Sequence, residues 1–139
     1  MFYEVYAFKG DWSPWDTSQV NEMTEMFTRA YAFNANVATW NTSRTTVMYG
    51  EFLNANSFNF HLSKWDTSKV TSFGNLFAYA SSFNGDVSSW NTSLVTMFSA
   101  ATSFNGDLSK WDTGQVSVMS WMFKGTTRFN GDLSRWNTS

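Results

Sequence analysis

A tryptophan-centred repeat runs through nearly all of the 139 residues of the chain. Each of its tryptophans is followed by Asp or Asn, then Thr, then Ser or Gly. Successive copies stand 25, 25, 25, 21 and 25 residues apart, at Trp15, Trp40, Trp65, Trp90, Trp111 and Trp136. A repeat of this length is typical of stacked units that bury their apolar faces on one another. The repeat therefore predicts an array of stacked units.

The repeat divides a single domain, 1–139, into units that begin at each tryptophan. A partial unit lies at each end, and the full units are 15–39, 40–64, 65–89, 90–110 and 111–135, with 1–14 and 136–139 as the partial ones. Neither end resembles a capping unit, and no signal peptide precedes the first unit. We therefore expect a fragment of a longer array, or a chain whose ends are covered by partners.

Apolar residues within each unit recur at intervals of three and four. In the first full unit they are Val20, Met23, Phe27 and Ala30. This spacing is typical of one face of a helix. The preceding Asp/Asn-Thr-Ser can cap the first free N–H groups of that helix. The pattern therefore predicts one short helix in each unit.

The segment before each tryptophan, of the form FNGDLSxW, predicts a turn followed by a short strand. Gly85, Gly106 and Gly131 are expected to adopt positive φ in these turns. One strand and one helix in each unit predict an α/β coil with a parallel sheet on one side. The unit of 21 residues lacks four residues before Met97. Since four residues are nearly one helical turn, Met97 and Phe98 should still point inward.

The composition excludes several classes of site. The chain has no Cys and one His, which excludes disulfides, zinc ribbons, thiol nucleophiles and multi-histidine metal sites. No apolar run is long enough to cross a membrane, and no basic cluster suggests nucleic acid. Glu51 and His61 are the only candidate catalytic pair. We therefore expect no enzyme and no cofactor.

The segment WDTSKVTSFGNLFAYASSFNGDVSSW resembles the BspA-like repeat of bacterial and mycoplasma surface lipoproteins. The resemblance covers essentially the whole chain, with departures in the second full unit at Thr45, Glu51 and Phe60-His61. It implies a right-handed α/β solenoid related to leucine-rich repeats. It also implies display at the cell surface or secretion, for adhesion or protein binding, and no catalytic residues.

Several residue columns have both a structural and a functional interpretation. The tryptophans can fill the core or form a platform for sugars. The threonines that follow them can cap helices or form the hydroxyl row of an ice-binding surface. Between each tryptophan and threonine stands Asp or Asn, and the two alternate from unit to unit. We expect these residues to form a capping ladder. The Asn members form Asn-x-Ser/Thr sequons, at Asn41, Asn91 and Asn137. A glycan at these sequons is a further alternative.

A second acidic column precedes the tryptophans, and its last three members are Asp86, Asp107 and Asp132. Three stacked carboxylates are a weak candidate for a calcium site, because Ca²⁺ prefers oxygen ligands. The alternative is that they close turns and are neutralised by Lys110 and Arg135. We favour the alternative and expect no metal.

The outward face of the expected helices carries large apolar residues in the later units. Candidates for binding a protein partner there are Tyr49, Leu53, Tyr79 and Trp121, because Tyr and Trp often dominate interfaces. The stack ends at Met1–Ala7 and Trp136–Ser139 are further candidate contacts. The sequence thus predicts a non-catalytic protein interaction or adhesion module. The alternatives are a structural subunit inside a larger assembly and, more remotely, an ice-binding protein.

Overall fold

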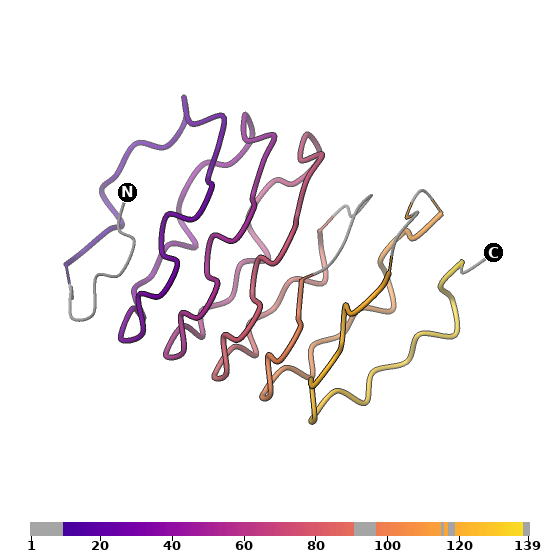
Figure 1. The fold of residues 1–139 in the computed structure, drawn as a ribbon. Coiled ribbons are helices and arrows are strands. Elements are labelled where there is room, and N and C mark those ends of the chain that lie inside the picture. The colour runs from indigo at the N-terminus through magenta and orange to yellow at the C-terminus, as the bar shows by residue number, and fades with distance from the viewer. Residues whose placement is uncertain (1–9, 91–96, 115, 117–118, 138–139) are drawn as a thin grey trace.

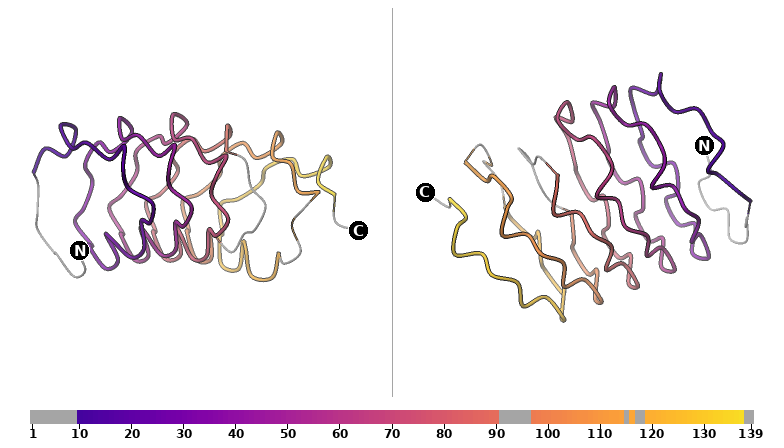
Figure 2. Two further views of the ribbon diagram at one scale, coloured as in Figure 1. Left: turned by 90° about the horizontal axis from the view of Figure 1, so that it is seen from above. Right: turned by 180° about the vertical axis from the view of Figure 1, so that it is seen from behind.

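The computed structural model describes residues 10–90, 97–114, 116 and 119–137. Successive units lie side by side as a row of coils, from the indigo unit at one end to the yellow unit at the other (Figure 1). The two turned views in Figure 2 show the same order of neighbours. Each coil therefore contacts the units that precede and follow it in the sequence.

No α-helix and no extended strand occurs in the described part of the chain. The regular pairing there is limited to isolated bridges, among them the parallel ones of Glu22 with Val47 and of Val47 with Ser72. The prediction of an α/β, leucine-rich-repeat-like solenoid with one helix and one strand in each unit is therefore wrong.

Consecutive tight turns occupy the segment that was expected to be helical. The N–H of Ala30 donates to the carbonyl of Phe27 at 3.1 Å, and the N–H of Phe33 donates to the carbonyl of Ala30 at 2.9 Å. These bonds span three residues, whereas an α-helix requires bonds that span four. Steps of three residues also bring every third side chain inward, which explains why the apolar spacing imitated a helix.

Backbone hydrogen bonds between neighbouring units replace the bonds of a helix. The N–H groups of Met23, Phe27 and Arg29 donate to carbonyls of the next unit at 2.9, 2.9 and 2.7 Å. The same pattern recurs one unit later, where the N–H of Phe52 donates to the carbonyl of Leu76 at 3.0 Å. The polar backbone is thus satisfied by stacking, so a unit depends on its neighbours.

Left-handed backbone recurs at two places in each unit of 25 residues, ten and fourteen residues after the tryptophan, and at Ala100 in the shorter unit. The φ values there lie between 52° and 73°, at Glu25, Arg29, Gly50, Asn54, Asn75, Tyr79, Ala100, Trp121 and Gly125. L-residues adopt this conformation singly and not in right-handed helices. These residues therefore interrupt any helix in the segment.

Two columns of phenylalanine rings fill the interior. Phe77 and Phe83 stack within one unit at 3.8 Å between ring centroids, and Phe77 stacks on Phe52 of the unit before at 5.6 Å. Phe27, Phe52, Phe77 and Phe98 are fully buried. Their predicted burial is confirmed, although no helix layer holds them, and Phe123 of the last full unit is only partly buried.

The shorter unit keeps its place in the stack. Met97 and Phe98 are fully buried, as expected, although the residues just before them lie outside the described residues. The N–H of Phe77 donates to the carbonyl of Met97 at 2.9 Å, as Phe52 does to Leu76 one unit earlier. Met97 and Phe98 therefore point inward with a hydrogen bond to the neighbouring unit, and the predicted loss of one helical turn does not apply because no helix is present among the described residues.

Close packing, and not a positive φ angle, explains the glycines before the tryptophans. The glycines with positive φ are Gly50 and Gly125, so the expectation for Gly85, Gly106 and Gly131 is wrong. A Cβ atom at Gly85 would lie 2.1 Å from the carbonyl oxygen of Phe60. Close approach of backbone to backbone therefore requires glycine at this position.

Candidate functional site

The tryptophan column is part of the core. Trp40, Trp65, Trp90 and Trp111 are each 3% exposed, which favours the core interpretation over a sugar platform for them. Each indole N–H donates at 2.9 or 3.0 Å to a backbone carbonyl 24 or 28 residues earlier in the chain. Trp15 differs, because 42% of its surface is exposed. The column thus joins units and leaves little ring surface for a ligand.

The threonine row is buried as well. Thr17, Thr42, Thr67 and Thr113 are at most 4% exposed. The hydroxyls of Thr17 and Thr42 each donate at 3.0 Å to a carbonyl of the following unit. These threonines therefore cap no helix and offer no exposed hydroxyl row, which the ice-binding alternative requires.

The Asp and Asn residues after the tryptophans close local turns. Asp16 and Asn41 accept hydrogen bonds from N–H groups two residues ahead, at 2.9 and 3.1 Å. The backbone N–H of Ser18 lowers the pKa of Asp16. The predicted cap is therefore a turn that precedes no helix. Asn41 and Asn137 are exposed sequon residues, whereas Asn91 lies outside the described residues.

The second acidic column has the same local role. Asp86, Asp107 and Asp132 each accept a hydrogen bond of 2.9 Å from a backbone N–H two residues ahead. This bond lowers the pKa of Asp107, and the charge of Lys110 lowers it further. Among the described residues, no three potential metal ligands of the Asp, Glu, His or Cys type gather. The calcium alternative therefore lacks a ligand group in this part of the chain.

An asparagine ladder was missed by the sequence reasoning. The side-chain oxygens of Asn34, Asn59, Asn84 and Asn105 each accept a hydrogen bond from the backbone N–H of the equivalent asparagine in the next unit, at 2.7 to 3.1 Å. The Phe-Asn pair in each unit was the available signal. The regular recurrence of this pair indicates a structural role between units, whereas the sequence analysis assigned the asparagine only to a local turn.

Glu51 and His61 do not form a catalytic pair. Glu51 is fully buried, and both of its carboxylate oxygens lack a hydrogen-bond partner among the described residues. Burial raises the pKa of Glu51 well above its ordinary value. His61 is exposed, and its Nδ1 accepts a hydrogen bond of 3.0 Å from the N–H of Asp86. The acid therefore faces the core, whereas the imidazole supports a turn.

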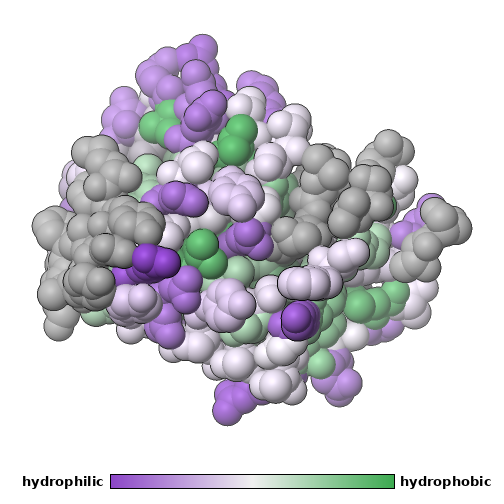
Figure 3. Space-filling model, viewed as in Figure 1, coloured by the Kyte–Doolittle hydropathy of each residue, from purple (hydrophilic) through white to green (hydrophobic). Residues whose placement is uncertain are grey.

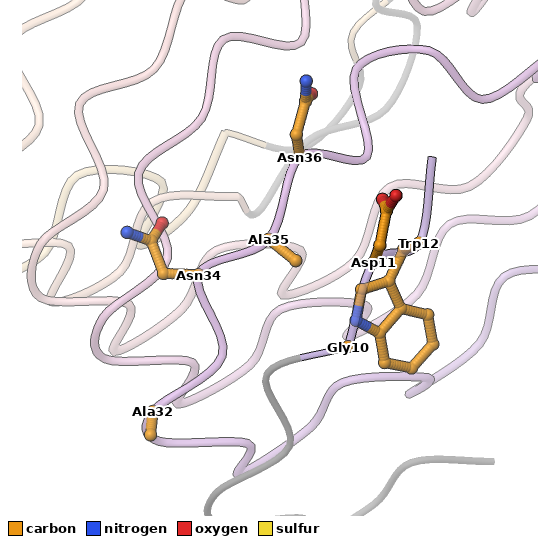
Figure 4. A pocket seen from close by; sticks show the side chains of 7 residues that line it. All are labelled: Gly10, Asp11, Trp12, Ala32, Asn34, Ala35 and Asn36. Atoms are coloured by element: carbon orange, nitrogen blue, oxygen red, sulfur yellow. The ribbon is translucent and has the colours of Figure 1, made fainter. Parts of the chain in front are cut away.

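A small pocket of about 360 Å³ lies beside the first full unit (Figure 4). Gly10, Asp11 and Trp12 line one side, and Asn34 and Asn36 belong to the other. The carboxylate of Asp11 accepts hydrogen bonds of 2.9 and 2.7 Å from the N–H and hydroxyl of Ser13. This pocket therefore offers an acidic group that already closes a turn.

A larger groove, of about 520 Å³, crosses the outer surface of four neighbouring units. It brings together three of the four predicted partner-binding residues, Leu53, Tyr79 and Trp121. The remaining lining residues are Asn54, Asn75, Ala78, Ser99 and Ser120. We call this surface the aromatic groove, and it is the candidate functional site.

Tyr49, the fourth predicted residue, lies at the border of the aromatic groove. Its hydroxyl oxygen accepts a hydrogen bond of 3.1 Å from the side-chain amide of Asn75, which lines the groove. A Cβ atom at Gly74 would lie 2.6 Å from the Tyr49 ring. Tyr49 thus positions Asn75 and covers Gly74, although it does not line the groove itself.

The two aromatic rings of the groove are unusually exposed. Tyr79 is 55% exposed and Trp121 is 69% exposed, the highest fractions among the large apolar residues described. The Nζ atom of Lys124 lies 4.1 Å from the centroid of the Trp121 ring, a cation–π contact. None of the groove-lining residues is charged. The groove is therefore suited to an uncharged ligand that packs on aromatic rings.

Four lining residues of the groove have left-handed backbone: Asn54, Asn75, Tyr79 and Trp121, with φ of 59°, 55°, 59° and 66°. Asparagine tolerates this conformation, whereas bulky residues rarely adopt it. Equivalent positions in other units hold Arg29, Asn54, Ala100 and Gly125 in place of Tyr, and Glu25, Gly50 and Asn75 in place of Trp. The aromatic side chains therefore stand where the backbone favours Gly or Asn.

Besides Tyr79 and Trp121, the exposed large apolar residues described are Trp15, Tyr31 and Tyr49. On the face shown in Figure 3, polar residues predominate and apolar residues form small, separate areas. No helix that is long and apolar enough to cross a bilayer occurs among the described residues. Of the predicted end contacts, Met1–Ala7, Thr138 and Ser139 lie outside the described residues, and Trp136 is partly buried.

A family model described as "Mycoplasma protein of unknown function, DUF285" matches residues 1–96 and 92–139. The chain belongs to this family. The two matches together cover all the repeat units. No curated protein and no solved structure was found to match the chain. The family description names no activity, so a functional proposal must rest on the aromatic groove.

Proposed function

We propose that this chain is a non-catalytic module that binds a protein partner through the aromatic groove, in an adhesive role. The observation that carries the proposal is the exposure of Tyr79 and Trp121 on left-handed backbone. Left-handed backbone at a non-glycine residue costs about 1–3 kcal/mol. Arg29 and Glu25 have the same backbone at the equivalent positions of the first full unit, so what distinguishes Tyr79 and Trp121 is a large exposed ring, which recovers little of this cost by burial.

The columns shared by the units have structural partners, which supports this assignment. The Trp, Thr and Asn columns donate or accept hydrogen bonds between units. A ligand can therefore be recognised best by residues that differ from unit to unit, as Tyr79 and Trp121 do. The resemblance to BspA-like surface repeats agrees with a partner met outside the cell.

A random-peptide display library can test this proposal. Peptides are selected on the wild-type protein and then measured against Tyr79→Asn and Trp121→Asn. We expect most enriched peptides to lose at least about tenfold in affinity for each variant, which equals about 1.4 kcal/mol. The matched controls are Arg29→Asn and Glu25→Asn, which change the equivalent positions of the first full unit, outside the groove.

The controls should retain wild-type affinity for the enriched peptides. Equal affinity of those peptides for the wild type and for both groove variants would contradict the proposal, because recognition would then lie elsewhere on the stack. Circular dichroism and urea unfolding of every variant show that the folded protein is being compared.

A further inference from the structure

We infer that the aromatic groove recognises a proline-rich, uncharged segment in the polyproline II conformation. This inference rests on the proposed function and names the chemistry of the partner. Four physical features of the groove lead to it: its committed backbone, its lack of charge, its aromatic rings with nearby amides, and its length along the stack.

The backbone at the groove has no room for an added strand. The N–H of Asn54 donates to the carbonyl of Ala78 at 2.9 Å, and the N–H of Tyr79 donates to the carbonyl of Ser99 at 2.8 Å. A peptide that binds by β-augmentation needs a free row of such groups. Because these groups are already bonded between units, recognition at the groove must use side chains.

The lining chemistry argues against two other common modes of peptide recognition. A helix bound in a groove needs a continuous apolar floor, but only Leu53 and Ala78 are aliphatic here. A phosphorylated or acidic motif needs clustered arginines, and none of the lining residues is charged. Lys124 beside Trp121 is a single cation and not a cluster. The ligand is therefore uncharged and does not depend on one large apolar face.

Polyproline II segments match the remaining features of the groove, which are its aromatic rings and side-chain amides. They dock on exposed aromatic rings, and their backbone carbonyls have no internal hydrogen bonds, so they can accept from side chains. Tyr79 and Trp121 provide the rings, and Asn54 and Asn75 provide amide donors. Proline is rigid before binding, so little conformational entropy is lost on a pre-formed groove.

The length of the groove agrees with the period of this conformation. Tyr79 belongs to the unit 65–89 and Trp121 to the unit 111–135, two units further along the stack. Backbone-bonded neighbours lie about 4.8 Å apart, so two units span roughly 9.6 Å. One turn of polyproline II, three residues of 3.1 Å, spans about 9.3 Å. Along the stack axis, prolines three residues apart therefore match this two-unit separation, and the rings are also offset within their units, at fourteen and ten residues after the tryptophan.

An acetylated and amidated decaproline is the test ligand, measured by calorimetry and by tryptophan fluorescence. We expect saturable binding to the wild type and at least about a tenfold loss of affinity in Tyr79→Asn and in Trp121→Asn. Arg29→Asn and Glu25→Asn should bind as the wild type does. A glycine–serine peptide of equal length, which is flexible, should not bind measurably.

Three results would overturn the inference. The first is the absence of saturable decaproline binding, and the second is equal binding by the groove variants. The third is binding of cellohexaose, a neutral sugar, that is lost in both groove variants while decaproline does not bind. If library peptides without proline still depended on Tyr79 and Trp121, the proposed protein-binding function would stand and only this inference would fail.

Discussion

The indole Nε1 of Trp65 donates a hydrogen bond of 2.9 Å to the carbonyl oxygen of Val37, 28 residues earlier in the chain. Both residues are buried, so the carbonyl would have no access to water if the indole N–H were removed. The carbonyl keeps a second hydrogen bond, of 3.1 Å from the backbone N–H of Trp40. We therefore expect Trp65→Phe to lower the free energy of unfolding by about 0.5–1.5 kcal/mol, the net contribution of one hydrogen bond. Urea unfolding measures this change.

Trp15→Phe is the matched control for this substitution. Trp15 occupies the equivalent position in the first full unit, but 42% of its surface is exposed. The control should change the free energy of unfolding by less than about 0.5 kcal/mol. If both substitutions lowered the free energy of unfolding by similar amounts, the loss could not be assigned to the hydrogen bond between Trp65 and Val37.

The buried acid Glu51 should destabilise the fold as pH rises. Its pKa is raised by burial when folded and is about 4.3 when unfolded. Below pH of about 4.3, both states are protonated and no penalty arises. Above it the unfolded state releases the proton first, so stability falls by up to about 1.36 kcal/mol per pH unit until the folded pKa is reached.

Replacement of Glu51 should therefore raise stability at neutral pH. Equivalent positions hold Met or Leu, as at Leu76 and Met97, so Glu51→Met should add about 1–3 kcal/mol by removing an unpaired buried polar group. Glu51→Gln should abolish the pH-dependent part of the difference. Urea unfolding at several pH values measures both. A wild-type slope that persisted in Glu51→Gln would assign the titration to another group.

The glycine at the turn before Trp90 should not tolerate a side chain. A Cβ atom at Gly85 would lie 2.1 Å from the carbonyl oxygen of Phe60, so Gly85→Ala must push two backbones apart. We expect a loss of about 1–3 kcal/mol in the free energy of unfolding. Gly114→Ala is the control, because a Cβ atom there approaches only the carboxylate of Asp112, at 3.2 Å. Equal effects would argue against this close approach.

The backbone at Tyr79 should reverse the usual ranking of substitutions. In a helix, Ala is more stable than Asn. On left-handed backbone, with φ of 59° at Tyr79, Asn is favoured over Ala. We therefore expect Tyr79→Asn to be more stable than Tyr79→Ala by about 0.5–1 kcal/mol. Thermal and urea unfolding of the two variants measure the difference, and a preference for Ala would indicate helical backbone there.

The interior could be predicted from the sequence because its residues repeat. The periodic Phe and Trp residues had to share a buried environment, and Phe77 and Trp90 do. The local backbone could not be predicted in the same way. Tight turns and a helix both bring apolar residues inward every three or four positions, so the spacing that includes Phe27 and Ala30 could not separate them.

One signal against a helix was present in the sequence. Gly50 and Asn75 occupy equivalent positions in the middle of the segment expected to be helical. Both residue types favour left-handed backbone, and neither favours a helix interior. Tyr79 and Trp121 obscured that signal, because large aromatic residues rarely adopt positive φ. The residues that best indicate the groove were thus the ones that most misled the prediction of its backbone.

The sequence predicted individual residues of the candidate site but not the groove that they form. Leu53, Tyr79 and Trp121 were chosen because they interrupt a polar face, and they do line one groove. The polar residues beside them, Asn54 and Ser99, could not be selected without knowing which turns meet across units. Their contribution depends on contacts between units that the period alone does not specify.

The hydrogen bonds of the tryptophan and threonine columns point in opposite directions along the stack. The indole N–H of Trp65 donates to a carbonyl 28 residues earlier, whereas the hydroxyl of Thr42 donates to a carbonyl 24 residues later. A unit such as 40–64 thus donates hydrogen bonds in both directions along the stack, from Trp40 and from Thr42. Recombination between units could duplicate or delete a whole copy and leave every joint matched, so proteins of this design could vary in length while their binding faces diversify.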